Sequence, residues 1–429
     1  MPNELNRVTD AVLAYRPAPT KRKEDSVFRD FTKSIPQALL DIEDKNRSNL
    51  FPWRGQFSPQ LIECILDAYC LPNSSILDSF MGSGTVLYEA AAKGLNAFGY
   101  EINPAAWNFS KLYEFCNMTP DAREGPIREL QGELEKEFPI VIFENGQLPL
   151  EEMRKKVVRI MGSVRAEATT LCNALVVSLD VFNHNVSNAF IQSKFATLVS
   201  LVRSLPYSSH AIRANLQDAR ALLVPDQSID FSVTSPPYIN VFNYHQNYRK
   251  SVEVLGWDLL RVARSEIGSN RANRGNRFCT VVQYCIDMAG AIQELARVLK
   301  PNGRAVFVVG HESNVLGTPF YNADIIEQIA LRSGMFDVPL RQQRVFTNRF
   351  GKPIREDLLN LMRKSCTLNK TSAVRLGRSI AREAFSSALQ AVPEKNRHLL
   401  TEAVSRVDEI SGTPLFDSYH CTTNFQASN

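Results

Sequence analysis

The sequence TSPPY at residues 234–238 places two consecutive prolines directly after residues 229–233, an apolar run that is typical of a buried strand. Each proline fixes φ at about −65° and removes a backbone donor, so neither a strand nor an ordinary helix continues through the pair. The motif therefore predicts a rigid corner at the carboxyl end of a strand, where open α/β sheets bind ligands. Such a corner can hold a flat ring carrying an amine, with Ser235 and carbonyls accepting hydrogen bonds and Tyr238 stacking on the ring.

A glycine-rich turn lies upstream, between a short apolar strand at 76–78 and a helical pattern that closes at Gly94. Gly82 and Gly84 allow the backbone to turn tightly and to approach a ligand without an intervening Cβ. The turn lacks the third glycine of a dinucleotide-binding fold and the G-K-[ST] ending of a phosphate-binding loop. By itself this turn does not identify a ligand.

Three acids lie at the expected strand ends: Asp78, Glu101 and Asp218. An acid at the tip of the second strand of a βαβ unit is placed to bind both hydroxyls of a ribose, which is the position of Glu101. Asp218 could accept a hydrogen bond from an adenine amine. The set suits a nucleoside that carries a positive charge and no phosphate. S-adenosylmethionine is such a ligand, because its sulfonium favours an acidic, aromatic-lined cleft.

A helix start precedes these strands, in the sequence FSPQ at residues 57–60. Ser58 is a good N-cap and Pro59 suits the first helical position. The helix N-terminus could bind the carboxylate of a methionine moiety, and Phe57 could pack on the adenine. Alternatively, Phe57 only packs against the helix as a hydrophobic staple.

The composition indicates a globular protein with no metal site and no membrane-spanning segment. The 429 residues are 44% hydrophobic and 22% charged, which leaves room for two or three domains or for one α/β domain with large insertions. No apolar run reaches the roughly 18 residues of a membrane span, and the first residues lack a secretory signal pattern. The eight scattered cysteines include no C-x-x-C, and the six histidines are equally scattered. We therefore expect a cytoplasmic protein with reduced thiols and no metal site.

Basic residues gather in two clusters although the net charge is only +4. Residues 341–382 contain eleven Lys or Arg against two acids, and residues 261–277 contain five Arg with Glu266 as the single acid. The guanidinium group of arginine can donate two parallel hydrogen bonds to phosphate oxygens, and neutralising the phosphates of DNA releases bound counterions. A solvated basic surface is the alternative interpretation. The residues expected to contact DNA are Arg271, Arg274, Arg277, Arg349 and Lys352.

Taken together, FSPQ, DSFMGSGT, the acid after the second strand and TSPPY resemble the S-adenosylmethionine-dependent amino-methyltransferases that act on DNA. These enzymes methylate the exocyclic amine of adenine at N6 or of cytosine at N4. The resemblance covers roughly residues 50–115 and 210–350, and the family usually has proline where this chain has Ser79. It implies catalytic roles for Ser235, Pro236, Pro237 and Tyr238. The cofactor-binding residues that we expect are Phe57, Ser58, Asp78, Phe80, Gly82, Gly84, Thr85, Glu101, Ile102 and Asp218.

The resemblance also implies a fold, and the helical patterns of residues 106–209, an unusually long segment for this family, indicate an insertion. We expect an α/β fold with a Rossmann-like class I methyltransferase sheet, a helical insertion and a basic C-terminal region. The expected divisions are an N-terminal extension (1–49), a cofactor-binding half (50–105), a helical insertion that is a candidate for target recognition (106–209), a catalytic half (210–350) and a basic helical C-terminal region that is a candidate for DNA binding (351–429).

The expected reaction needs neither a covalent intermediate nor a metal. Hydrogen bonds from the target amine to Ser235 and to the Pro236 carbonyl would return the nitrogen lone pair from the ring, and Tyr238 would stack on a base flipped out of duplex DNA. Serine at the first position of the motif favours cytosine N4 in this family. The alternatives are an adenine-N6 enzyme, an RNA amine or protein glutamine methyltransferase, and an inactive DNA-binding module. A cognate restriction endonuclease is a candidate partner.

Overall fold

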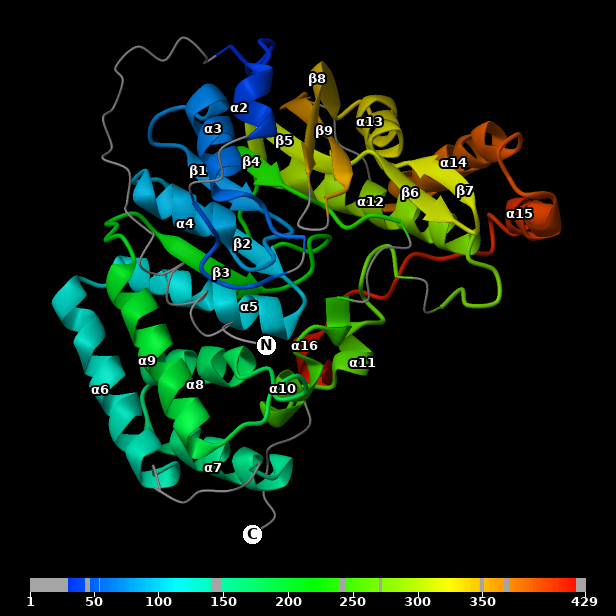
Figure 1. Cartoon of the computed structure of the whole chain (residues 1–429). Helices are drawn as coiled ribbons and strands as arrows, with labels where there is room; N and C mark the ends of the chain where they lie inside the picture. The colour runs from blue at the N-terminus through cyan, green and yellow to red at the C-terminus, as the bar shows by residue number, and fades with distance from the viewer. Residues whose placement is uncertain are drawn as a thin grey trace.

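A seven-stranded sheet forms the centre of the protein (Figure 1). The computed structural model describes residues 30–42, 47–53, 55–139, 148–239, 244–269, 272–347, 351–365 and 370–421. The strand order is β3-β2-β1-β4-β5-β9-β8. The strands are β1 (Ser75–Asp78), β2 (Asn96–Glu101), β3 (Ile212–Leu216), β4 (Ile229–Thr234), β5 (Leu299–Gly310), β8 (Phe336–Thr347) and β9 (Pro353–Arg363). A separate hairpin pairs β6 (Glu312–Val315) with β7 (Thr318–Tyr321).

The first five strands of this order are parallel, and β9 runs antiparallel to both of its neighbours. One reversed strand near the end of an otherwise parallel α/β sheet is the arrangement expected of a class I methyltransferase. The predicted fold class is therefore confirmed by the strand order. The order also reverses direction between β1 and β4, which makes the carboxyl ends of these two strands the expected ligand-binding point.

Helices cover both faces of the sheet, which explains why its inner strands are apolar runs rather than alternating ones. Val306 and Val308 of β5 belong to one buried cluster, whereas Ala305 and Phe307 belong to the cluster on the opposite face. The first face is covered by α3 (Pro59–Tyr69), α4 (Thr85–Ala92) and α5 (Pro104–Lys111), and the second by α12 (Cys279–Val298), α13 (Asn322–Arg332) and α14 (Lys370–Ala388).

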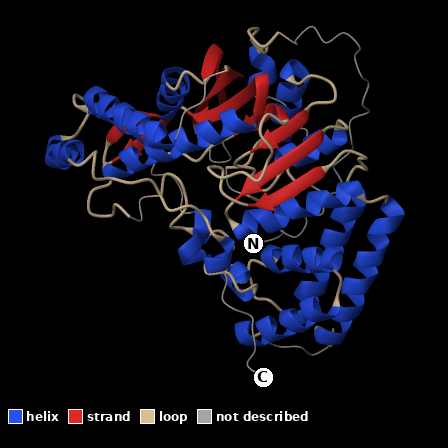
Figure 2. Cartoon of the chain, turned by 180° about the vertical axis from the view of Figure 1, so that it is seen from behind, coloured by secondary structure: helices blue, strands red, loops and turns tan. Residues whose placement is uncertain are grey.

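The expected helical insertion lies between β2 and β3 and forms a group of helices beside the sheet (Figures 1 and 2). It follows α5, which packs on β2 and β3, and η1 (Leu112–Asn117). Its helices are α6 (Pro120–Glu137), α7 (Leu150–Ser163), α8 (Ala166–Ser178) and α9 (Asn188–Ser204). Arg123 is fully buried there and donates to five backbone carbonyls, among them those of Phe115 and Leu205, so it joins both ends of the insertion.

The predicted boundary at residue 350 is wrong, because it falls between two strands of one sheet. β9 lies between β5 and β8, so residues 353–363 are part of the catalytic sheet rather than of a separate C-terminal region. The sequence reasoning missed β9 because its first half carries charged residues. The short elements that complete the chain are α2 (Gln37–Asp41), η2 (Tyr244–Gln246), α10 (Arg249–Val254), α11 (Leu259–Val262), η3 (Glu394–Asn396), α15 (Arg397–Ser405) and α16 (Ser418–Cys421).

None of the helices in the described ranges is long and apolar enough to cross a membrane. Those same ranges hold no cluster of three or more His, Cys, Asp or Glu side chains suited to a metal ion.

Candidate active site

Three polar groups join the carboxyl ends of β1 and β4, and we call this contact the β1–β4 junction. The Thr234 hydroxyl donates to Asp78 Oδ1 at 2.7 Å, and the Phe80 N–H donates to Asp78 Oδ1 and to Thr234 Oγ1, both at 3.1 Å. Asp78 and Thr234 are almost completely buried. The junction therefore fixes the start of the glycine turn against the residue that immediately precedes Ser235.

Asp78 plays a different role from the one predicted. It is 1% exposed and does not line the cleft, whereas the next two residues, Ser79 and Phe80, do. Its Oδ2 atom has no hydrogen-bond partner among the described residues, and burial raises the pKa of Asp78 to about 7. Asp78 thus supports the cofactor turn from behind instead of facing a ligand.

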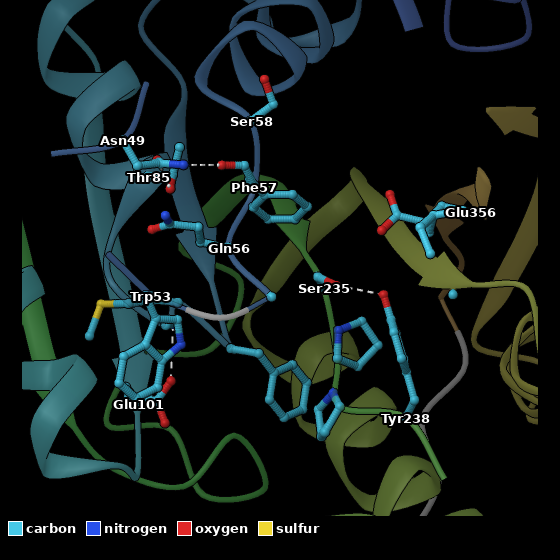
Figure 3. A pocket seen from close by; sticks show the side chains of 18 of the residues that line it. Asn49, Trp53, Gln56, Phe57, Ser58, Thr85, Glu101, Ser235, Tyr238 and Glu356 are labelled. Carbon is cyan, nitrogen blue, oxygen red and sulfur yellow. Dashed lines mark hydrogen bonds between the residues drawn. The ribbon is translucent and has the colours of Figure 1, made fainter. Parts of the chain in front are cut away.

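A cleft of about 1870 Å³ opens over the carboxyl ends of the parallel strands (Figure 3). It brings together most of the residues that the sequence singled out. Its walls include Phe57, Ser58, Phe80, Gly82, Thr85, Glu101, Ile102, Asp218, Ser235, Pro236, Pro237 and Tyr238. Of the predicted cofactor residues, Asp78 and Gly84 are the two that do not line it.

The two glycines of the turn have separate structural roles. Gly82 has φ of +52° and donates its N–H to Glu101 Oε2 at 3.0 Å. Gly84 has φ of +89°, and a Cβ on it would lie 2.8 Å from the Tyr113 ring, so only glycine fits. The second oxygen of Glu101 accepts from Asn103 N at 2.8 Å, and burial raises the pKa of Glu101 to about 7. Glu101 is therefore held at the tip of β2, at the edge of the cleft.

The segment before α3 forms the opposite wall of the cofactor half. The side chain of Asn49 donates to the Phe57 carbonyl at 2.7 Å and accepts from the Thr85 hydroxyl at 2.8 Å, which ties this segment to the start of α4 (Figure 3). Ser58 occupies the N-cap position of α3 but makes no capping hydrogen bond through its side chain. Trp53 packs near Gly82 and lines the cleft. The sequence reasoning did not select Trp53.

The TSPPY corner forms as predicted, at the end of β4. The hydroxyls of Ser235 and Tyr238 lie 3.5 Å apart. Tyr238 packs directly on the end of β5, since a Cβ on Gly310 would come within 2.6 Å of its ring. Asn322, fully buried at the start of α13, accepts from the Ile239 N–H at 3.3 Å and donates to the Gly310 carbonyl at 3.0 Å. Asn322 thus holds the chain leaving the corner against β5.

Glu266 is another cleft-lining carboxylate, and the sequence reasoning did not select it. It is 8% exposed, and its Oε2 lies 3.0 Å from Nδ1 of the buried His245. Its Oε1 has no hydrogen-bond partner among the described residues. The charge of Glu266 contributes to the raised pKa of Glu101, after the larger effect of burial. Its sequence signal was that it is the single acid in an arginine-rich loop.

Asp218 lines the cleft, but its carboxylate is already engaged. Its Oδ1 accepts from the backbone and Nε of Arg220 at 2.9 and 2.8 Å, and its Oδ2 accepts from Arg220 Nη2 at 2.7 Å and from Phe416 N at 3.0 Å. These four bonds use the acceptor positions of both oxygens. We therefore correct the expectation that Asp218 binds an adenine amine: it instead anchors the wall of the cleft.

Residues 412–417, which we call the C-terminal strap, complete this anchor. The Thr413 hydroxyl lies 2.6 Å from Arg220 Nη1 and 3.0 Å from Asp287 Oδ2, and the Thr413 N–H donates to Asp287 Oδ1 at 3.0 Å. Arg220, Asp218 and Asp287 are buried together, so each charge depends on the others. Residues from the far end of the chain thus fix one wall of the cleft.

The two basic clusters differ in how much of their charge is accessible. In the 341–382 cluster, four cations form ion pairs with nearby acids: Arg341, Arg344, Lys364 and Arg382. Arg274, Arg277 and Lys352 are exposed, as DNA contacts must be. Arg355 is also exposed and lines the cleft, although the sequence reasoning did not select it. Arg271 and Arg349 lie outside the described residues.

His311 lines the cleft and is held by a residue of β9. Its Nδ1 lies 2.8 Å from Asp357 Oδ2, and Arg341 donates to the other oxygen of Asp357 at 3.1 Å. This arrangement ties the residue after β5 to the neighbouring strand.

The sheet order is that of the class I methyltransferase fold, and the glycine turn and the proline corner lie where this fold binds its ligands. A family model described as DNA methylase matches residues 10–111. The chain is also 38% identical over 88 residues to a protein of Methanocaldococcus jannaschii named Type II methyltransferase M.MjaII, a match that spans 20% of this chain and 17% of that protein. These findings confirm the resemblance to the DNA amino-methyltransferase family, and the family match begins earlier than the expected residue 50.

Solved structures align over much of the chain with low similarity. A SAM-dependent methyltransferase from Methanosarcina mazei is 13% identical with a TM-score of 0.34, and the alignment covers 70% of this chain and 97% of that one. The rRNA methyltransferase aviRa from Streptomyces viridochromogenes is 11% identical with a TM-score of 0.29, covering 83% and 98%. The fold class follows from the strand order of the sheet.

Replacing Asp78 by Asn should remove a pH-dependent part of the stability. The pKa of Asp78 is raised in the folded state, so its contribution is present below about pH 4 and is lost as the pH rises to about 7. A rise of the Asp78 pKa to about 7 corresponds to roughly 4 kcal/mol of free energy of unfolding. Urea unfolding of both proteins at pH 5 and pH 8 should show the variant gaining relative stability at pH 8. An equal difference at both pH values would contradict the raised pKa.

Replacing Thr413 by Val should weaken binding of S-adenosylmethionine. The change removes hydroxyl contacts to Arg220 and Asp287 that fix the Asp218 wall, and a lost buried hydrogen bond of about 1–1.5 kcal/mol corresponds to roughly a five- to tenfold higher Kd. Calorimetric titration measures this. Thr413→Ser should restore the affinity, and Leu415→Ala, at an exposed strap position, is the matched control. Wild-type affinity in Thr413→Val would show that the strap does not shape the site.

Proposed function

We propose that this protein is a DNA methyltransferase that transfers a methyl group from S-adenosylmethionine to the N4 amine of a flipped cytosine in duplex DNA, within a restriction-modification system. The observation that carries the proposal is the position of the TSPPY corner. Ser235 and Pro236 line the same cleft as Gly82 and Glu101, so an acceptor ring in the corner would lie beside a nucleoside held by the turn. The match spans 17% of the length of the curated relative.

The residues of the cofactor half fit S-adenosylmethionine. Glu101 uses one lone pair of each oxygen for Gly82 N and Asn103 N, which leaves acceptor capacity for ribose hydroxyls. The orphaned oxygen of Glu266 and the aromatic walls formed by Trp53 and Phe57 suit a cationic, partly apolar ligand. The cofactor is S-adenosylmethionine, which supplies an electrophilic methyl group when bound.

The corner activates the acceptor amine by hydrogen bonding. The lone pair of an aromatic amine is delocalised into its ring, which makes the nitrogen a poor nucleophile. The Ser235 hydroxyl and the Pro236 carbonyl accept the two amine hydrogens and draw the nitrogen towards a tetrahedral form, which returns the lone pair. Tyr238, fixed against Gly310, offers a face on which the flipped base stacks. Asn322 keeps these groups in place.

The surface around the cleft supports a polyanionic substrate. Arg264 directly precedes the cleft-lining residues 265–267, and Arg355 lines the cleft on β9, so exposed cations flank it on two segments. Arg274, Arg277 and Lys352 add positive charge to the same two segments. Cations here can neutralise DNA phosphates, while the carboxylates Glu101 and Glu266 lie deeper, where a cationic cofactor binds. This division of charge supports a DNA substrate.

The choice of cytosine rests on Ser235. A hydroxyl both accepts and donates, so it can serve the amine and the neighbouring ring nitrogen of cytosine. Adenine N6 is the alternative target, followed by an RNA amine and by DNA binding without catalysis.

Transfer of tritiated methyl groups to duplex DNA, followed by separation of the nucleosides, tests the proposal. We expect label in N4-methylcytosine, and a loss of about 100-fold in Ser235→Ala with unchanged cofactor affinity, because one preorganised hydrogen bond is removed. Ser228→Ala, just before the amino end of β4, is the matched control. Label in N6-methyladenine would contradict the base assignment, and label only in RNA, or none, would contradict the DNA assignment.

A further inference from the structure

The proposed reaction leaves a proton without an acceptor among the residues of the corner. As the N–C bond forms, the C–S bond breaks and its electron pair goes to sulfur, so the methylated nitrogen is left with one proton too many. The Ser235 hydroxyl and the Pro236 carbonyl are neutral and keep no proton at neutral pH. An ionised side chain close to the corner would complete the reaction.

Glu356 lies in a row of residues that begins at the corner. Gly310 of β5 touches the Tyr238 ring, Gly310 pairs with Glu356 of β9, and Glu356 pairs with Arg344 of β8. Residues directly opposite each other in an antiparallel pair lie about 4.5–5.5 Å apart and project to the same face. Glu356 therefore projects to the face on which Tyr238 lies. Figure 3 shows its carboxylate directed into the cleft that Ser235 and Tyr238 also line.

Only one of the two carboxylate oxygens of Glu356 is hydrogen-bonded to the described residues. Arg344 Nε and Nη2 both bind Oε2, at 2.8 and 2.7 Å, and Oε1 makes no hydrogen bond with the described residues. Arg344 is itself nearly buried and stacks on Phe346 with its guanidinium 4.5 Å from the ring centroid. The two contacts with Arg344 hold the Glu356 carboxylate in one orientation, with one oxygen left for a ligand.

The other titratable groups near this row are less suited to the proton. Asp357, the next residue of β9, projects to the opposite face, and His311 is bound to it through Nδ1. Arg341 pairs with Asp357, and Arg355 is a cation that accepts no proton. Glu312 is exposed on the separate β6–β7 hairpin.

We propose that Glu356 is the proton acceptor for the target amine. The N–H electron pair stays on nitrogen, and the proton passes to Oε1 of Glu356, directly or through one water, and then to solvent. This role rests on the proposed function. It assigns the acceptor to a residue of β9, more than one hundred positions after the TSPPY motif.

Single-turnover methylation of duplex DNA by Glu356→Gln tests the proposal. The amide keeps an oxygen for Arg344 but cannot take a proton, so the transfer rate should fall about 100-fold, the usual loss for a missing general base. The Kd for S-adenosylmethionine and the fluorescence of a 2-aminopurine placed at the target base should stay at wild-type values. Glu312→Gln, which removes the same charge from a neighbouring exposed position, is the matched control and should transfer at the wild-type rate.

The outcomes separate this proposal from the proposed function. A wild-type transfer rate in Glu356→Gln, with the wild-type protein active on DNA, overturns the role of Glu356 alone. A wild-type protein that transfers no methyl group to DNA overturns both. Where Glu356→Gln binds no cofactor because buried Arg344 has lost its partner charge, the double variant Arg344→Met Glu356→Gln removes the pair. A wild-type rate in the double variant overturns the proposal, and a rate lowered about 100-fold with retained cofactor binding supports it.

Discussion

The site depends on the three hydrogen bonds of the β1–β4 junction. Asp78 and Thr234 lie at the carboxyl ends of adjacent parallel strands, and the Phe80 N–H binds both. The glycine turn begins at one end of this contact and the proline corner at the other. A cofactor held by the turn and a base held by the corner would therefore meet at a distance set by the strand spacing. The junction is buried, and in a medium of low polarity its hydrogen bonds have little competition from water.

The charges of the site form two layers. Glu101 and Glu266 lie inside the cleft, where burial raises the pKa of Glu101, while exposed arginines and lysines flank the opening. A cation with a nucleoside fits the first layer and a phosphate backbone the second. The Arg220 network ties the C-terminal strap to the acidic wall, so residues 413 and 416 contribute to the shape of the cleft.

The sequence was sufficient to predict the features that depend on local chemistry. The two prolines after an apolar run predicted the corner, and the glycines predicted the turn. Features set by long-range packing could not be predicted. The engagement of Asp218 depends on Phe416, nearly two hundred residues later, and the burial of Asp78 depends on Thr234. Glu356 lies near the corner only because β9 pairs with β5. The charged residues in the first half of β9 prevented its prediction as a strand. In the basic cluster at residues 341–382, ion pairs with nearby acids leave less positive charge accessible to a ligand than the composition suggested.

The most direct test of the junction is the single-turnover rate of methyl transfer by Thr234→Val. Valine has nearly the shape of threonine but lacks the hydroxyl that joins Asp78 to Phe80. We expect the protein to remain folded and to bind S-adenosylmethionine, while the transfer rate falls by tenfold or more, since a misplacement of about 1 Å can cost about 100-fold. A wild-type rate in this variant would contradict the claim that the junction aligns the two halves of the site.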